Sequence, residues 1–344
     1  MSTRVGELIF SHSLRARRYS IFLREILWEL LSDIMRRSPL GQSVDGKNFA
    51  IMLLEGNVKK RLTFVITTIL LAGVAAAQSA HPHSDFFTTS DHIKIHYLES
   101  GNGRDVVLIP GWTMPAWIWQ PQIDAFSKKY HVIAVDPRSQ GESDKPTFGH
   151  LPETRARDYK ELVDHLQLKK PVLIGWSMGC GELMKYVEQF GTDNLAGLVL
   201  VDGLVWDKPM PELFVGMSGW MNQLQADRQK QADGFVRSMF KKPQPDSYYK
   251  RLVDASTAVP ADTAVVLIYN MAAVKDFSAA LAKVNKPLLF TYQPQTQATA
   301  DLLKTKLGDQ AQTEKFDDAG HALFIDDADR FNQVVEKFVD SLPQ

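Results

Sequence analysis

A serine in a short glycine-rich motif is the clearest candidate for chemistry in this sequence. Ser177 lies at the centre of G-W-S-M-G, residues 175–179, which fits the pattern G-x-S-x-G. The motif follows the apolar run 171–176, a predicted strand, and opens the predicted helix 178–190. A sharp turn between strand and helix exposes the serine, and the helix N-terminus directs backbone N–H groups at a developing oxyanion. Ser177 is therefore predicted to attack a carbonyl carbon.

The elements that must position this serine form an alternating series. From His92 onward, short apolar runs alternate with amphipathic stretches, which predicts a parallel sheet covered by helices on both faces. Most runs are continuous in Val, Ile and Leu, as strands buried on both faces require. The predicted strands are 92–98, 106–110, 132–136, 171–176, 197–202, 287–292 and 314–317, and the predicted helices include 152–168, 178–190, 298–307 and 327–342.

One long interval interrupts this alternation. Residues 204–283 are rich in Met, Trp and Phe and have the pattern of several amphipathic helices, with only an ambiguous apolar run at 264–269. We predict an α/β core made of 85–203 and 284–344, in which 204–283 is a helical cap inserted after the sixth strand and packed over one edge of the sheet. Residues 1–77 are predicted to be an extension followed by a signal peptide or a membrane anchor.

Composition and charge exclude several classes of protein. With 44% hydrophobic and 23% charged residues, the chain is neither mostly disordered nor a multi-span membrane protein. Its net charge of −1 divides into +5 on residues 1–61 and −6 on the remainder, and an acidic body argues against a nucleic-acid groove. The single cysteine, Cys180, excludes an intramolecular disulfide and a thiolate metal cluster. We expect Cys180 to be buried and unreactive.

The ordered motifs resemble the α/β-hydrolase superfamily over about residues 92–342. L-I-P-G-W at 108–112 resembles the strand and oxyanion loop usually written H-G-x, and D-P-R-S-Q-G-E-S at 136–143 resembles D-x-R-G-x-G-x-S. A-G-H-A at 319–322 is similar to the late G-H of the superfamily. The resemblance implies an α/β-hydrolase fold, with a mostly parallel, doubly wound sheet, and an enzyme that needs no cofactor and no metal.

Some residues narrow the resemblance and others depart from it. Residues 111–112 and G-E-L-M-K-Y at 181–186 look like the cofactor-free haloperoxidase and perhydrolase branch. Pro110 stands where the superfamily usually has His, and Ser139 where it usually has Gly. These departures affect the supports of the oxyanion loop and no group that is expected to react.

The order of the superfamily's catalytic residues selects the base. That order is Ser, then acid, then His. Only one of the nine histidines, His321, follows Ser177. His321 also lies after the last predicted strand and before the final predicted helix, so the resemblance implies that it takes the proton of Ser177.

The acid has more than one candidate. Most relatives place it in the loop after the strand that corresponds to 287–292, but here that loop is Q-P-Q-T-Q, residues 293–297, without a carboxylate. Asp202 closes the preceding strand, a position that haloalkane dehalogenases of similar fold use, and we favour it. The alternatives are Asp301, inside a predicted helix, and a histidine supported by water alone.

The expected activity is hydrolysis of a small or medium carboxylic ester through an acyl-enzyme on Ser177. The backbone N–H groups of Trp112 and Met178 would form the oxyanion hole, and Asp136 and Arg138 would support loops. Perhydrolase or haloperoxidase-like activity and lactonase activity on the same residues are alternatives, and so is a non-catalytic ligand-binding protein. The expected partner is a small ester and not a nucleic acid. Haloalkane dehalogenase and epoxide hydrolase activities are disfavoured, because those relatives need a carboxylate at the position of Ser177.

An export signal is predicted near the N-terminus. Lys59, Lys60 and Arg61 precede the apolar run 62–77, which ends in three alanines. This is the pattern of a secretory signal with cleavage after Ala77, and 16 residues are few for a membrane span. Its position suggests that Met52 is the physiological start. The expectation is a periplasmic or secreted protein, and the alternative is a single-pass anchor.

Overall fold

A single eight-stranded sheet organises the computed structural model, which describes residues 82–343. The strand order is β1-β2-β4-β3-β5-β6-β7-β8. Strands β3 to β8 are parallel to one another, whereas β1 pairs with β2, and β2 with β4, in antiparallel fashion. The strands are β1 His83–Thr88, β2 Lys94–Ser100, β3 Arg104–Ile109, β4 Tyr130–Val135, β5 Val172–Trp176, β6 Gly197–Val201, β7 Leu288–Tyr292 and β8 Ala311–Lys315.

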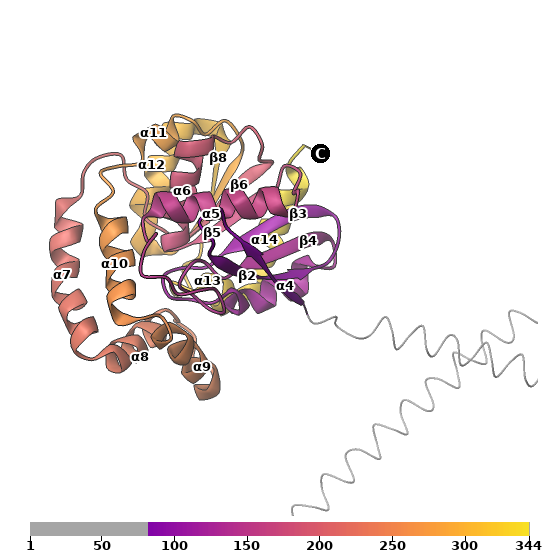
Figure 1. Ribbon diagram of the computed structural model, residues 1–344. Coiled ribbons are helices and arrows are strands. Elements are labelled where there is room, and N and C mark those ends of the chain that lie inside the picture. Colours follow the sequence, from indigo (N-terminus) through magenta and orange to yellow (C-terminus); the bar gives the residue numbers. More distant parts are fainter. Residues whose placement is uncertain (1–81, 344) are drawn as a thin grey trace, which may run out of the picture. The chain divides into compact units, whose positions relative to one another are not determined.

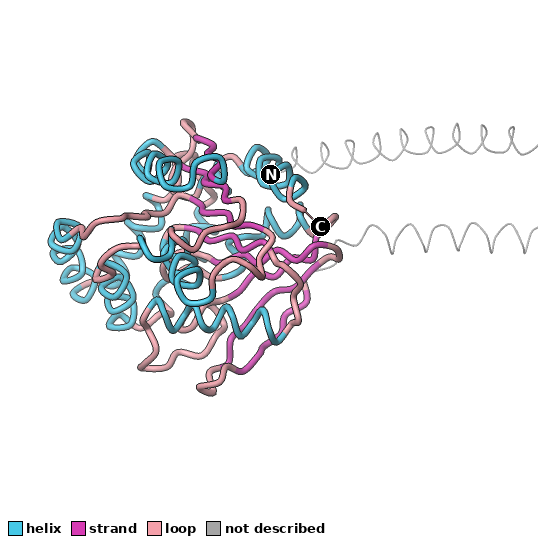
Figure 2. Tube along the Cα trace, turned by 90° about the horizontal axis from the view of Figure 1, so that it is seen from above, coloured by secondary structure: helices cyan, strands magenta, loops and turns pink. Residues whose placement is uncertain are grey.

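Helices cover both faces of this sheet (Figures 1 and 2). Residues of α4 and α14 share one buried cluster with the strands, and residues of α5, α6, α11 and α12 share the cluster on the opposite face. The helices of these layers are α4 Gln120–Phe126, α5 Pro152–His165, α6 Met178–Phe190, α11 Ser278–Leu281, α12 Gln297–Leu307, α13 Leu323–Asp326 and α14 Ala328–Ser341.

The central strands show why this sequence forms such a sheet. Along β3, Val106 and Leu108 belong to one buried cluster and Val107 and Ile109 to the other. Successive side chains of a strand point to opposite faces, so a continuous apolar run supplies both cores at once. The same pattern places the carboxyl ends of β3 to β8 at one edge of the sheet, where the residues that follow each strand meet.

The insertion between β6 and β7 is helical in the structure, including residues 264–269. Four of its helices, α7 Pro211–Ala226, α8 Arg228–Ser238, α9 Asp246–Thr257 and α10 Ala261–Ala272, lie together at one side of the sheet (Figure 1). Leu224, Ala264 and Leu267 of these helices share a buried cluster with Trp112 and Met178 from the core. The cap therefore packs onto the residues that follow β3 and β5.

Most predicted strands and helices lie within a few residues of the observed ones. Helix α6 has the predicted bounds, and the fold is the predicted α/β-hydrolase fold. Strand β8 begins and ends earlier than predicted, and β1 and α4 were not predicted. Only Phe87 of β1 is buried, so this edge strand has no apolar run to reveal it. Within the described residues no single helix is long and apolar enough to span a membrane. Helices α9 and α10 together have the length and composition of a span, but the pair is bent by 84°.

Candidate active site

Ser177 occupies a strained turn between β5 and α6. Its backbone has φ 56° and ψ −117°, a left-handed conformation that costs a residue with a side chain about 1 to 3 kcal/mol. The turn is tight: a Cβ on Gly175 would lie 2.6 Å from the carbonyl oxygen of Gly179, and one on Gly111 would lie 2.9 Å from Cβ of Ser177. The close passage of strand and helix therefore requires glycine at 175 and 111.

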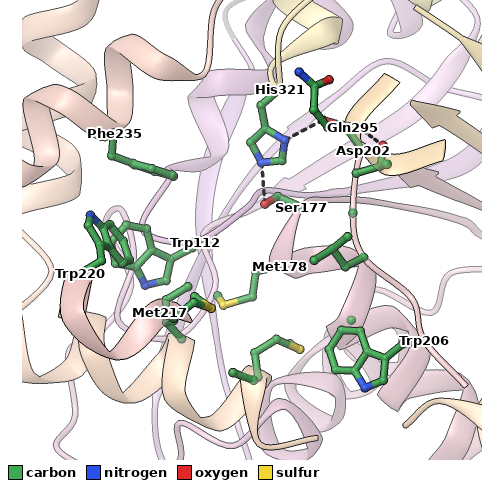
Figure 3. Close-up of a pocket in the computed structure, with 17 residues that line it drawn as sticks. Trp112, Ser177, Met178, Asp202, Trp206, Met217, Trp220, Phe235, Gln295 and His321 are labelled. Atoms are coloured by element: carbon green, nitrogen blue, oxygen red, sulfur yellow. Dashed lines mark hydrogen bonds and ion pairs between the residues drawn. The ribbon is translucent and has the colours of Figure 1, made fainter. Parts of the chain in front are cut away.

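The structure brings Ser177, His321 and Asp202 into one hydrogen-bonded chain (Figure 3). His321 Nε2 lies 2.8 Å from Ser177 Oγ, and His321 Nδ1 lies 2.7 Å from Asp202 Oδ2. An ionised carboxylate can only accept hydrogen bonds. Nδ1 therefore carries the ring proton and donates a hydrogen bond to Asp202. Nε2 is then left to accept the hydroxyl hydrogen of Ser177. The arrangement can transfer a proton from serine to imidazole while a carboxylate stabilises the cation.

Asp202 is held in place by the loop after β7. It follows β6 with φ 46° and is 1% exposed. Its second oxygen, Oδ1, accepts from the backbone N–H of Gln293 at 3.0 Å and from Thr296 Oγ1 at 2.5 Å. The loop after β7 has no carboxylate of its own, and it binds the carboxylate that comes from β6.

The loop that carries His321 is anchored on both sides of the histidine. The Gly320 N–H donates to Asp326 Oδ2 at 2.8 Å, and the same oxygen accepts from the Lys241 N–H at 2.7 Å. The His321 carbonyl accepts from Trp176 Nε1 at 2.9 Å. The imidazole therefore projects from a backbone that is bonded to both the core and the cap.

The two predicted oxyanion donors border the same pocket as Ser177. Met178 is the first residue of α6, so no carbonyl of its own helix can accept its N–H. Trp112 follows β3 and its indole Nε1 donates to the Ala264 carbonyl of α10 at 2.8 Å. Next to it, Thr113 Oγ1 and Ser256 Oγ of α9 are 2.8 Å apart. The loop after β3 is thus bonded to two helices of the cap.

A buried polar network, which sequence reasoning missed, supports that loop from the core. Gln140 Nε2 donates to the carbonyls of Gly111 at 3.0 Å and Met114 at 2.8 Å. Gln140 Oε1 accepts from Arg155 Nη2 at 2.9 Å, and Arg155 Nε donates to Glu182 at 2.5 Å.

The network is almost free of solvent, and this affects its charges. Arg155 and Glu182 are each 1% exposed, and the Tyr159 hydroxyl donates to the second oxygen of Glu182. Burial raises the pKa of Glu182, and burial together with the charge of Glu182 raises the pKa of Tyr159 well above its ordinary value. The carboxylate of Glu182 is stabilised by Arg155, which gives this pair a structural role under the loop.

The pocket around Ser177 is apolar. Its volume is about 390 Å³, and Asp202 and His321 are the only acidic, basic or histidine side chains among its lining residues. Three aromatic rings pack edge to face on one side, where Trp112 lies 5.2 Å from Trp220 and 5.0 Å from Phe235 between ring centroids (Figure 3). Further lining comes from Leu204, Trp206, Met217, Ile268, Met271 and Ala272.

The remaining sequence candidates lie away from this chain of hydrogen bonds. Asp301 is exposed on α12, where its Oδ1 accepts from Gln297 Nε2 at 2.9 Å. Cys180 is fully buried, and burial raises the pKa of its thiol, as expected for an unreactive cysteine. Ser139 adopts φ 72°, a conformation that glycine takes without strain, and its hydroxyl contacts His150 Nε2 at 3.1 Å. No group of three His, Cys, Asp or Glu residues suited to a metal occurs within 82–343.

Comparison with known proteins identifies the family. Residues 106–334 match the alpha/beta hydrolase family. The chain belongs to this family. Among curated relatives of the hydrolase, the non-heme chloroperoxidase CPO-A1 of Kitasatospora aureofaciens is 38% identical over 118 residues, 34% of this chain and 43% of that protein. The chain therefore matches less than half of that relative's length.

Two further comparisons extend over most of the hydrolase. The AB hydrolase superfamily protein YisY of Bacillus subtilis (strain 168) is 24% identical over 271 residues, 74% of this chain and 99% of YisY. The solved esterase EaEST from Exiguobacterium antarcticum aligns with a TM-score of 0.68 and 24% identity, over 75% of this chain and all of the esterase chain. At this identity the structural likeness establishes the fold.

Proposed function

We propose that this hydrolase cleaves carboxylic esters of small or medium size through an acyl-enzyme on Ser177. The observation that carries the proposal is the hydrogen-bonded chain from Ser177 through His321 to Asp202 at the border of an apolar pocket. The relatives include proteins named as esterases, among them EaEST.

The reaction uses each group of the site once in each half. Ser177 Oγ bonds to the carbonyl carbon of the ester while its proton passes to His321 Nε2. Backbone N–H groups of Trp112 and Met178 stabilise the resulting oxyanion. The imidazolium returns the proton to the alkoxide, which leaves as the alcohol. Water, deprotonated by His321, then hydrolyses the acyl-serine and releases the acid, and Asp202 stabilises the imidazolium in both halves.

The pocket selects the kind of ester. Its aromatic and methionine side chains favour an uncharged, apolar acyl or alcohol group, because a charged group would lose its hydration without a partner. A volume of about 390 Å³ lies at the small end of ligand pockets. Rates should therefore rise with acyl length at first and fall once the chain exceeds the pocket.

A second candidate function is formation of a peracid on the same acyl-serine. The match to a chloroperoxidase over 118 residues favours it. Hydrogen peroxide would replace water in the second half of the reaction and release a peracid. A cyclic ester, a lactone, would pass through the same two steps as a linear one.

Nitrophenyl esters of increasing acyl length test the proposal directly. We expect turnover by the parent protein, none by Ser177→Ala of equal melting temperature, and an optimum at short or medium chains. Addition of hydrogen peroxide separates the two candidates, because peracid release at the expense of hydrolysis identifies the perhydrolase. A folded parent that neither hydrolyses these esters nor reacts with a fluorophosphonate would instead be a binding protein.

We also propose that the protein is exported. The predicted signal at 62–77 and the predicted start at Met52 lie outside the described residues. The support is the sequence of basic residues 59–61, the apolar run and the three alanines that end it. Mass spectrometry of protein from the cell envelope or medium should find an N-terminus at Gln78. A product that keeps residues 62–77 in the membrane would identify an anchor instead.

A further inference from the structure

A second serine, histidine and aspartate are linked in the same way as those of the active site. Ser84 Oγ of β1 lies 2.8 Å from His96 Nε2 of β2, and His96 Nδ1 lies 2.7 Å from Asp136 Oδ2, just after β4. The atoms and the distances match those of Ser177, His321 and Asp202. This set is absent from the proposed ester hydrolysis.

The surroundings of Asp136 define where the protons lie. Its carboxylate accepts from the backbone N–H of Ala116 at 2.5 Å and of Glu142 at 2.9 Å. Because two backbone N–H groups already donate to Asp136, its side chain is an acceptor. His96 Nδ1 therefore carries the ring proton and donates to Asp136 as well. Nε2 is then the acceptor for the hydroxyl of Ser84. His96 is 4% exposed and Asp136 is 2% exposed, whereas Ser84 is exposed on the edge strand.

Ser84, His96 and Asp136 border a cavity of their own. It has a volume of about 410 Å³ and shares no lining residue with the pocket of Ser177. Arg251 of α9 also lines it, with its guanidinium 3.7 Å from the ring centroid of Trp117. Within residues 82–343 this guanidinium has no ion-pair partner. The cavity thus borders a polarised serine, one guanidinium and the carboxylates of Asp136 and Glu142.

One difference from the active site limits what this serine can do. Ser177 lies at the N-terminus of α6, whereas Ser84 lies within strand β1, so no helix begins at the residue that follows it. The stabilisation of an oxyanion by aligned helix N–H groups is therefore missing at Ser84. Arg251 is the one Lys or Arg among the residues that line the cavity, and we assign the positive charge for an oxyanion to it.

We propose that Ser84 is a second nucleophile, which takes the acyl group of activated carboxylic esters in this cavity. Ser84 Oγ bonds to the acyl carbon and its proton passes to His96 Nε2. The bond to the leaving alcohol breaks, and His96 returns the proton to that oxygen, which gives acyl-Ser84 and the free alcohol. Without helix N–H donors, both formation and hydrolysis of acyl-Ser84 are slower than at Ser177.

The test uses the full chain with Ser177→Ala, so that success or failure at Ser84 is independent of the proposed ester hydrolysis. A small fluorophosphonate is the probe: Ser84 Oγ bonds to phosphorus, fluoride leaves, and the proton remains on His96. Peptide mapping should find the adduct on Ser84, and it should be lost in Ser177→Ala/Ser84→Ala. Ser84 is exposed, so this substitution leaves the core unchanged.

A nearby serine provides the matched control. Ser90 is also exposed, but its hydroxyl donates to Glu161 at 2.6 Å and not to a histidine. We expect no adduct on Ser90. An equal adduct on Ser90 and Ser84, or none on Ser84 in a folded sample, would overturn the proposal.

The role of Arg251 has its own measurement. Arg251→Gln removes a charge from an exposed side chain. We expect Ser84 to be labelled about tenfold more slowly, a smaller effect than the roughly 10²- to 10³-fold cost of losing a preorganised oxyanion donor. His96→Gln should abolish the adduct in a protein that melts like the parent. Unchanged labelling in either variant would contradict the assignment of that residue.

Discussion

Asp202 Oδ2 lies 2.7 Å from His321 Nδ1, so the carboxylate that holds the imidazole comes from the end of β6. The loop after β7, where the resemblance to the superfamily led us to look for the acid, supplies hydrogen-bond donors to this carboxylate through Gln293 and Thr296. An acid at the end of β6 therefore goes together with a loop after β7 that donates hydrogen bonds and has no carboxylate. A carboxylate in the loop would be repelled by Asp202.

Replacement of Asp202 tests its effect on turnover. In Asp202→Asn the side-chain amide can donate to Nδ1, which turns the imidazole into the wrong tautomer, and we expect kcat to fall by roughly 10^4-fold. Asp301→Asn is the matched control, because that carboxylate contacts Gln297 on the exposed face of α12. We expect it to keep the activity of the parent. An Asp202→Asn protein that melts like the parent and stays within about tenfold of its activity would refute the assignment.

The strain at Ser177 predicts an unusual order of stability. Glycine adopts φ 56° freely and alanine does not, so Ser177→Gly should be more stable than Ser177→Ala by about 1 kcal/mol. Urea unfolding of both inactive variants measures the difference. Ser218, exposed on helix α7, is the control position, where the order should reverse because glycine weakens a helix. If Ser177→Ala were at least as stable as Ser177→Gly, the turn at Ser177 would store no strain.

The buried network predicts a large loss of stability when one partner is removed. Arg155→Met leaves the carboxylate of Glu182 without its guanidinium in a site that is 1% exposed, and should destabilise the protein by about 3 to 5 kcal/mol. Arg157→Met removes an arginine from the same helix whose side chain is 40% exposed, and should cost about 0 to 1 kcal/mol. Similar unfolding midpoints for the two variants would contradict this account of the network.

His131 on β4 makes stability depend on pH. Burial of the ring opposes its charged form, but hydrogen bonds to Asp105 and Glu99, each at 2.7 Å, outweigh burial and raise the pKa of His131 above 6.5. A raised pKa means that the ion pairs stabilise the fold fully below pH 6.5 and that this contribution is lost as pH rises through the folded-state pKa. His131→Gln should therefore destabilise the protein most just below pH 6.5 and least at alkaline pH. If the loss of stability in His131→Gln were constant or grew with pH, this account of His131 would be wrong.

The sequence predicted the parts of the fold that depend on buried apolar runs. Strands β3 to β7 lie close to their predicted positions because each supplies both cores. Strand β1 was missed because only Phe87 is buried, and pairing with β2 rather than burial holds it in place. Hydrophobic periodicity carries no information on such a strand.

Some residues of the site could be predicted from the sequence and others could not. A motif in its local context predicted Ser177, and chain order left only His321, so the structure finds these two within hydrogen-bond distance. The catalytic roles of Ser177, His321 and Asp202 stay predictions. Gln140, Arg155 and Glu182 could not have been grouped in advance, because they are distant in sequence and their pairing depends on how α5 and α6 pack. Local pattern shows which residues could react, but only packing shows what holds them.

The bonds between the loop after β3 and the cap have a consequence for how this protein evolves and how it can be engineered. Trp112 depends on a carbonyl of α10 and Thr113 on a hydroxyl of α9, so adjacent residues of the loop rely on two helices of the insertion. Exchange of the insertion for that of a relative would leave a buried indole N–H without an acceptor unless the graft brings one. Loop and insertion must therefore change as a matched pair, and a chimera should include both segments.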